Sequence, residues 1–371
     1  MKLLILAVLV AAVAALQRES DFMTILPESW YEEEANKAAA DDPDTFNMPF
    51  FMNADESMSA DFGASNFGDP KNVLDVAQQL GATIFVHAAY YTKTADTFKN
   101  TQSITAFIPS NAAFARLPKN IYFYFLRHPD RLAALLKYHV AQGVFMIKDL
   151  VNDQTYKTLE KDWTLRYDAY NHTSINYTSR IIQTARISHR HVDQAASNGV
   201  VHIIDEVILG IPFFSAYDVI SKSTHFSTLY NGLIVAGLDQ SLKSAGPLTL
   251  FAPTEEAFKR LPPGVWEALL KDKTALTNVL DLHLANRTYF ARGFRDMDVL
   301  PTLNKANSLT VHIRRHRGDE DVQRGPSRPE VEVEVNDAKI IFFDGVVTNG
   351  IIQVVDTVLL PPKIKEQYNL L

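Results

Sequence analysis

Cysteine is absent from all 371 residues of the sequence. Without thiols the chain has no disulfide, no thiolate zinc or iron–sulfur site and no cysteine nucleophile. Also missing are the G-x-S-x-G, G-x-x-x-x-G-K, G-x-G-x-x-G and H-E-x-x-H motifs of hydrolases, nucleotide-binding proteins and zinc proteases. These absences predict a protein that is not an enzyme and that carries no cofactor and no metal.

Basic residues are scarce in one segment, 17–69, which holds 13 Asp and Glu against Arg18 and Lys37. This segment contributes −11 to a formal net charge of −7, so the remainder of the chain is close to neutral. We expect an extended acidic N-terminal segment that does not fold by itself. The near-neutral remainder offers no positive field for phosphates, which excludes nucleic acid as a partner.

Long hydrophobic runs are also lacking. Lys2, the apolar stretch 3–10 and the small residues Ala12 and Ala14 are typical of a signal peptide over residues 1–16. An uncleaved anchor or a buried helix are the alternatives. No later stretch approaches 18 uninterrupted apolar residues, and the tail 362–371 is polar, so we expect a secreted protein without a transmembrane segment. Three sequons support this route as glycosylation sites on exposed loops, at Asn171, Asn176 and Asn286.

Three sequence blocks occur twice in the same order. Residues 105–118 match 249–262, and 135–139 match 279–283, both at an offset of 144. Residues 198–209 match 349–360 at an offset of 151. The chain is therefore predicted to be a duplication, with a first domain over 70–212 and a second over 213–361.

Each block predicts local structure of an α+β domain. Residues 249–252 form an apolar strand that ends at Pro253, and Ser110 or Thr254 then caps the following helix. The next helix carries one buried stripe at i, i+3, i+4 and i+7 in both copies. The stripe consists of Leu132, Leu135, Leu136 and His139, and of Leu276, Val279, Leu280 and His283. Asn-Gly opens the third block as a turn before a buried strand, and Glu332 and Glu334 alternate with core-facing valines.

These blocks resemble the fasciclin family. The resemblance rests on the Thr-x-Phe-x-Pro block, on Tyr138-His139 and on the Asn-Gly-x-x-His-x-Ile-Asp segment at 198–205. The second copy departs from it with Leu282 before His283 and with Gln353 where the first copy has His202. Membership implies two wedge-shaped β-sandwiches with helices packed at one end, and a role in adhesion or matrix contact.

The histidines that recur in both copies, His139 and His283, are candidates for catalytic residues. A catalytic or metal-binding His139 or His283 needs a partner group, and neither copy supplies one by its spacing. We expect both rings to be buried and bonded to backbone, a structural role that Tyr138, Asp205 and Asp356 share as parts of the same motifs.

His189 and His191 are candidates for a metal site. Two residues apart on a probable strand, they would share one face, with His202 nearby. The second copy does not repeat the pair, so we expect a solvated strand face.

Arg317-Gly318-Asp319 reproduces the integrin-recognition tripeptide. It lies in Arg314–Pro329, where the seven additional residues of the second copy are placed, and such a charged loop is the setting this motif needs. The alternative is a solvated loop without a partner.

The sequence thus predicts a secreted adhesion or matrix protein that binds protein or glycan ligands at the cell surface. A trafficking factor of a vacuolar or other secretory lumen is the second hypothesis, and a cell-surface hydrolase the third.

Overall fold

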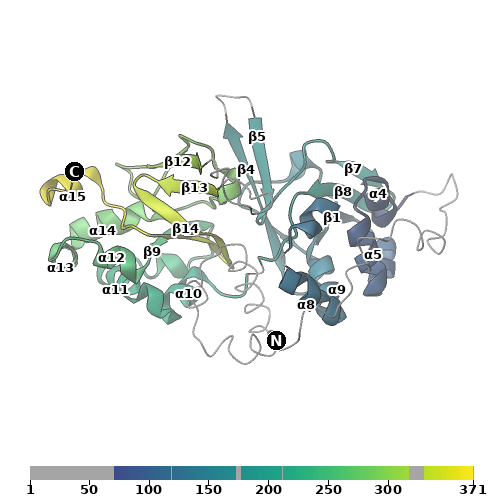
Figure 1. Ribbon diagram of the computed structural model, residues 1–371, viewed down its shortest axis with the longest axis horizontal. Coiled ribbons are helices and arrows are strands. Elements are labelled where there is room, and N and C mark those ends of the chain that lie inside the picture. The colour runs from purple at the N-terminus through teal and green to yellow at the C-terminus, as the bar shows by residue number, and fades with distance from the viewer. Residues whose placement is uncertain (1–70, 118, 173–176, 211, 317–329, 371) are drawn as a thin grey trace, which may run out of the picture. The chain divides into compact units, whose positions relative to one another are not determined.

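The computed structural model describes residues 71–117, 119–172, 177–210, 212–316 and 330–370, and the chain divides into two compact units at Pro212. In Figure 1 the first is drawn from purple to teal and the second from green to yellow. Each unit mixes helices and strands in the same order, so the predicted duplication of an α+β domain is confirmed.

The helices of the two domains correspond one to one over most of their length. In the first domain they are α4 (Val73–Gln79), α5 (Thr83–Tyr91), α6 (Ala95–Asn100), α7 (Asn111–Ala115), α8 (Lys119–Arg127), α9 (Pro129–Tyr138) and the 3₁₀ turn η4 (Ile147–Asp149). In the second they are α10 (Ala216–Lys222), η6 (Thr224–Phe226), α11 (Ser227–Ala236), η7 (Ser241–Lys243), α12 (Glu255–Lys259), α13 (Val265–Lys271), α14 (Lys273–Leu282), η8 (Ala291–Gly293) and α15 (Pro362–Gln367). None of the helices in the described ranges is both long and apolar enough to cross a bilayer.

The strands of the first domain form two four-stranded sheets, in the orders β2-β1-β8-β7 and β3-β4-β5-β6. They are β1 (Ile104–Pro109), β2 (Val140–Gln142), β3 (Thr155–Lys157), β4 (Thr164–His172), β5 (Tyr177–Ile182), β6 (Ala185–Arg186), β7 (Gln194–Ala196) and β8 (Gly199–Ile204). The central pair, β1 and β8, is parallel, and helices α4, α5 and α9 bury their apolar faces against it.

The second domain joins its strands into one seven-stranded sheet, in the order β10-β9-β15-β14-β13-β12-β11. They are β9 (Leu248–Pro253), β10 (Leu284–Ala285), β11 (Val299–Leu300), β12 (Leu309–His316), β13 (Glu330–Val335), β14 (Ala338–Val347) and β15 (Gly350–Val355). Strand β14 is long enough to pair with both β13 and β15. The first domain has two short strands, β6 and β7, in its place, and this break separates the two sheets.

Local sequence explains the ends of these elements. Strands β1 and β9 end at their prolines, and the hydroxyls of Ser110 and Thr254 accept the N–H groups of Ala113 and Ala257, so both predicted caps are confirmed. Pro129 opens α9, where its missing N–H costs no hydrogen bond.

One glycine in each domain permits a close approach of backbones. A Cβ on Gly199 would lie 1.9 Å from the Ile104 carbonyl oxygen, and one on Gly350 would lie 1.9 Å from that of Leu248. Both glycines open the last strand of their domain, directly after the turn. The Asn-Gly pair therefore ends the turn and also lets the parallel strands start side by side.

Candidate functional site

The histidines of the repeated helix, His139 and His283, lie at the C-caps of α9 and α14 and are each 1% exposed. The His139 Nδ1–H donates to the Leu135 carbonyl (2.8 Å), and its Nε2 accepts the Ile208 N–H (2.9 Å). The second domain repeats both bonds, at 2.9 and 3.0 Å, with His283, Val279 and Leu359. Burial lowers the pKa of both rings to about 4, although the bond to the helix carbonyl opposes it. Each neutral ring ties a helix end to the segment after the last strand.

The closing aspartates bond to backbone in the same way. The Asp205 carboxylate accepts the Arg186 N–H at 2.8 Å, and the Arg116 guanidinium donates to the Asp205 carbonyl. The second domain repeats this with Asp356, Lys339 and Arg260, at 2.9 and 3.0 Å. Arg116 and Arg260 belong to the repeated Arg-Leu-Pro sequence, so the contact joins the first repeated block to the last.

Two buried asparagines, Asn198 and Asn349, each bond to three backbone groups outside the turn in which they lie. The Asn198 Oδ1 accepts the N–H of Val73, the first residue of α4 (3.0 Å). Its Nδ2 donates to the carbonyls of Phe98 (2.7 Å) and Thr101 (2.8 Å). The second domain repeats all three bonds with Asn349, Ala216, Leu242 and Ser244, at 2.8 to 2.9 Å. The sequence predicts both only as turn residues, and their recurrence at the same offset is the signal that points to a larger role.

A fourth shared position holds different residues in the two domains. In the first, the His202 Nε2–H donates to the Phe145 carbonyl at 2.9 Å, and its Nδ1 accepts the Asp193 N–H at 3.1 Å. The second domain makes the same two bonds at 2.9 and 3.0 Å, through the amide Nε2 and Oε1 of Gln353 to Tyr289 and Asp344. The departure noted in the sequence therefore preserves the bonding pattern, because a neutral imidazole and an amide both offer one donor and one acceptor.

The aspartates next to this position are matched too, with positive φ of 53° and 56°. The carboxylate of Asp193 accepts the Ile147 N–H, and that of Asp344 accepts the Ala291 N–H, both at 2.8 Å. Burial raises the pKa of Asp344 to about 6, against the opposing bonds from Ala291 and Gln353. Burial lowers the pKa of His202. The same hydrogen-bond arrangement thus contains a histidine with a lowered pKa in the first domain and an aspartate with a raised pKa in the second.

Tyr138, which precedes His139, has no tyrosine as its counterpart in the second domain. Its side chain is fully buried, and its hydroxyl donates to the Gly210 carbonyl at 2.9 Å. Burial raises the pKa of this phenol well above its usual range. In the second domain Leu282 is equally buried at the corresponding place, without a hydroxyl to bond.

His189 and His191 do not lie on a strand, and that prediction was wrong. They are exposed in a bend between β6 and β7, whereas His202 is buried on β8 and bonds to Phe145. The alternation of His-Arg-His is compatible with a strand, but Ser188 turns the chain by accepting the N–H groups of Arg190 and His191. Across the residues that the structure describes, no three His, Asp or Glu side chains are gathered so as to hold a metal ion.

The predicted modification and adhesion sites fall partly outside the described residues. Asn171 is exposed at the end of β4, and Asn286 is exposed in a bend after β10. Asn176 and the tripeptide Arg317-Gly318-Asp319 lie outside the described ranges, as do residues 1–69. Glycosylation and integrin binding stay predictions.

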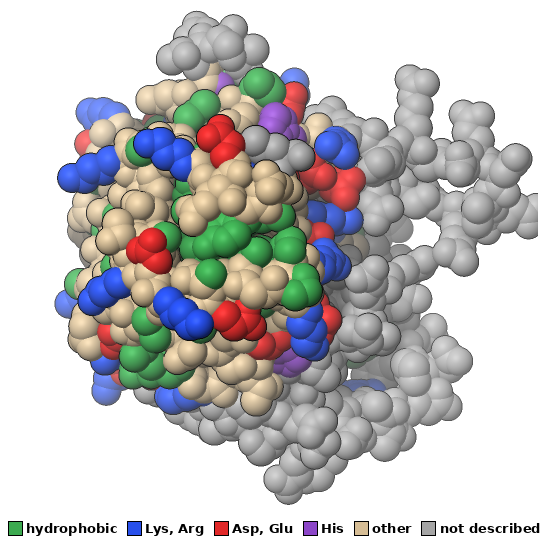
Figure 2. All heavy atoms as spheres, turned by 90° about the vertical axis from the view of Figure 1, so that its left-hand side faces the viewer, with side chains coloured by type: hydrophobic (Ala, Val, Ile, Leu, Met, Phe, Trp, Pro, Cys, Tyr) green, Lys and Arg blue, Asp and Glu red, His purple; other side chains and the backbone are tan. Residues whose placement is uncertain are grey.

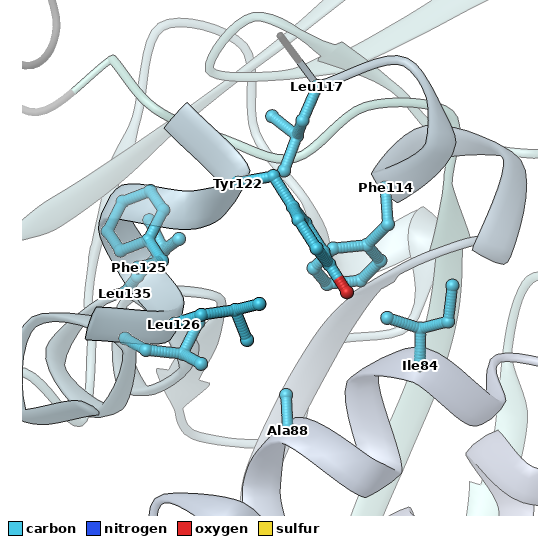
Figure 3. Close-up of a pocket in the computed structure, with 9 residues that line it drawn as sticks. Ile84, Ala88, Phe114, Leu117, Tyr122, Phe125, Leu126 and Leu135 are labelled. Carbon is cyan, nitrogen blue, oxygen red and sulfur yellow. The ribbon is translucent and has the colours of Figure 1, made fainter. Parts of the chain in front are cut away.

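The first domain has an apolar hollow, which α5, α7, α8 and α9 line together. Figure 3 shows Tyr122 and Phe114 facing Ile84 and Ala88 across it. At the matching offset of 144 the second domain has Trp266 for Tyr122 and Gly232 for Ala88. The indole lies so close to Gly232 that a Cβ there would be 2.8 Å from it. In the second domain a larger ring therefore packs directly over a smaller residue at these positions.

Comparisons with known proteins agree on one family. The Fasciclin domain profile matches residues 80–210 and 224–361. Human periostin is 28% identical over 77% of this chain, and pig transforming growth factor-beta-induced protein ig-h3 is 27% identical over 72%. The chain spans about a third of the length of either relative, at 32% and 36%. Protein sll1483 of Synechocystis is 30% identical over 46% of this chain and 79% of its own.

A solved structure of the FAS1 domain pair from the insect cell adhesion molecule fasciclin I matches 77% of this chain and 99% of its own, at 20% identity. Its TM-score of 0.36 is too low to support an argument about function. The two matches of the family profile together cover most of the chain, one for each copy of the repeated blocks. The chain belongs to the fasciclin domain family and contains two tandem fasciclin domains.

Proposed function

We propose that this protein is a secreted, non-enzymatic binding protein that contacts the extracellular matrix or the cell surface. The observation that carries the proposal is the use of the polar residues that both domains share. The histidines, aspartates and asparagines of the repeated motifs all bond to the backbone of their own domain. Groups committed in this way hold a scaffold, and recognition is left to the surfaces that differ between the domains.

Periostin and ig-h3 support an adhesion-type role in general terms, as longer relatives with the same domain. The signal peptide and the sequons predicted from the sequence support an extracellular destination. A vacuolar or other lumenal destination is the alternative, and a C-terminally tagged copy distinguishes the two. Accumulation of the tag in the medium supports export, whereas retention in an organelle contradicts it.

Cell attachment to surfaces coated with the purified chain tests the binding role. We expect attachment above that on an albumin coat, and no attachment for any cell type would contradict the proposal. Asp319→Glu tests the tripeptide separately, with Glu320→Asp as the matched control that makes an equally conservative change next to it. Equal attachment of both variants would remove the tripeptide from the proposal without removing adhesion itself.

A further inference from the structure

The bend at 188–191 is specific to the first domain. Arg186 and Asp193 are seven positions apart, whereas their counterparts Lys339 and Asp344 are five apart within the unbroken β14. The first domain therefore has two additional residues here. Its bend carries His189, Arg190 and His191, where the second domain has the apolar residues 340–343.

The bend is held in a fixed conformation and not left as an open loop. The Ser188 N–H donates to the Ile203 carbonyl (2.8 Å), and the Ile203 N–H donates to the His191 carbonyl (2.9 Å). Together with the Ser188 hydroxyl, these bonds fix the bend against β8 while its three basic side chains stay exposed. A bound anion would therefore require little ordering of the backbone.

Two arginines on neighbouring strands, Arg180 of β5 and Arg186 of β6, place positive charge beside the bend. The Arg180 guanidinium of β5 lies 3.4 Å from the His189 Nδ1. Burial is the largest cause of the lowered pKa of His189, and the charges of Arg180 and Arg186 add to it, because both guanidinium groups lie near the ring. Within the described part of the chain, neither Arg180 nor Arg190 forms an ion pair with a carboxylate. On the face of the second domain that Figure 2 shows, basic and acidic side chains are interspersed.

We propose that Arg180 and the bend 188–191 form a binding site for the sulfate groups of a sulfated glycosaminoglycan. Guanidinium groups suit sulfate, because their planar N–H donors match a tetrahedral oxyanion. Cations gathered on one fixed surface suit a polyanion that lies across it. The inference rests on the proposed function in taking the partner to be an extracellular glycan.

Heparin binding by the full-length protein tests the site. The affinity of the purified chain for a heparin oligosaccharide is measured as a function of salt, beside Arg190→Glu and Lys271→Glu. Lys271 is an exposed cation on α13 of the second domain, so both variants change the net charge equally. We expect Arg190→Glu to weaken binding and to lower the slope of log affinity against log salt by about 1. Lys271→Glu should leave both quantities close to those of the wild type.

Three results would overturn the proposal. They are no binding of the wild type at physiological salt, equal losses in the two variants, or equal affinity for unsulfated hyaluronan or duplex DNA. Unfolding curves show whether each variant is folded, and Arg190→Gln replaces Arg190→Glu if it is not. Attachment of cells without heparin binding would refute the glycan site and leave the proposed function intact. Heparin binding without attachment would do the reverse.

Discussion

The two fasciclin domains of this chain differ in two distinct ways at matched positions. At His202 and Gln353 the side chain changes, but both hydrogen bonds to backbone are kept. At the bend 188–191 the backbone changes, and exposed basic residues replace an apolar strand. The comparison teaches that the buried polar positions are constrained by their bonding pattern, whereas the segments between them are free to acquire surface functions.

The largest effect should come from the two glycines that start the last strands. Gly199→Ala and Gly350→Ala each force a Cβ to within 1.9 Å of a carbonyl oxygen, so the parallel strand pair must separate. We expect a loss of more than about 3 kcal/mol in the domain that carries the change. Gly264→Ala is the control, because nothing lies within 4 Å of its added Cβ and only its positive φ of 86° costs about 1 kcal/mol. Denaturant unfolding measures all three, and equal losses would contradict this account.

The next largest effect should come from His139→Leu and His283→Leu, each of which should lower the free energy of unfolding of its domain by about 2 kcal/mol. Each change leaves the buried N–H of Ile208 or Leu359 without its acceptor. Trp163 reports on the first domain once Trp30 and Trp266 are phenylalanine, and Trp266 reports on the second in the converse variant. A loss in only one domain would show that the two histidines are not equivalent.

A smaller effect is expected from acid, which should lower the stability of the two domains to different extents. A histidine whose pKa falls from 6.5 to about 4 on folding takes up protons more readily when unfolded, so stability falls as pH drops below about 6.5. His139 and His283 each cost their domain about 2 kcal/mol at pH 5. His202 adds to this loss in the first domain. In the second domain Asp344 offsets about 1 kcal/mol of this loss. Its pKa is raised to about 6 on folding, so between pH 7 and pH 5 the folded state binds the proton more tightly than the unfolded state does.

We therefore expect the first domain to lose more stability than the second between pH 7 and pH 5. Urea unfolding at both pH values, followed with the same single-tryptophan variants, measures this difference. A larger loss in the second domain would contradict the assignment of titratable groups.

Local rules predicted much of the fold, and non-local pairing set the limit. The N-caps Ser110 and Thr254 and the strand ends at Pro109 and Pro253 depend on neighbouring residues, so they could be predicted from the sequence. The parallel pairing of β1 with β8 could not, because it joins segments about 95 residues apart along the chain and their local sequences contain no register.

The candidate site was predicted less completely for the same reason. The bend at 188–191 alternates like a strand, and only the match of Asp193 to Asp344 reveals its two additional residues. Asn198 and Asn349 fit a turn equally well with or without their bonds to the first helix. Which backbone groups a buried side chain reaches is decided by tertiary packing, which the sequence pattern does not specify.

The substitution His202→Gln tests most directly whether the bonding pattern, and not the residue type, is what the two domains share. If the introduced amide adopts the bonds of Gln353, the stability of the first domain at pH 7 should change by less than about 1 kcal/mol, and its loss at pH 5 should shrink. His202→Leu, which cannot bond to Phe145 or Asp193, should cost about 2 kcal/mol and serves as the reference. Unfolding of the first domain at both pH values is the decisive measurement. A loss for His202→Gln as large as that for His202→Leu would contradict the account.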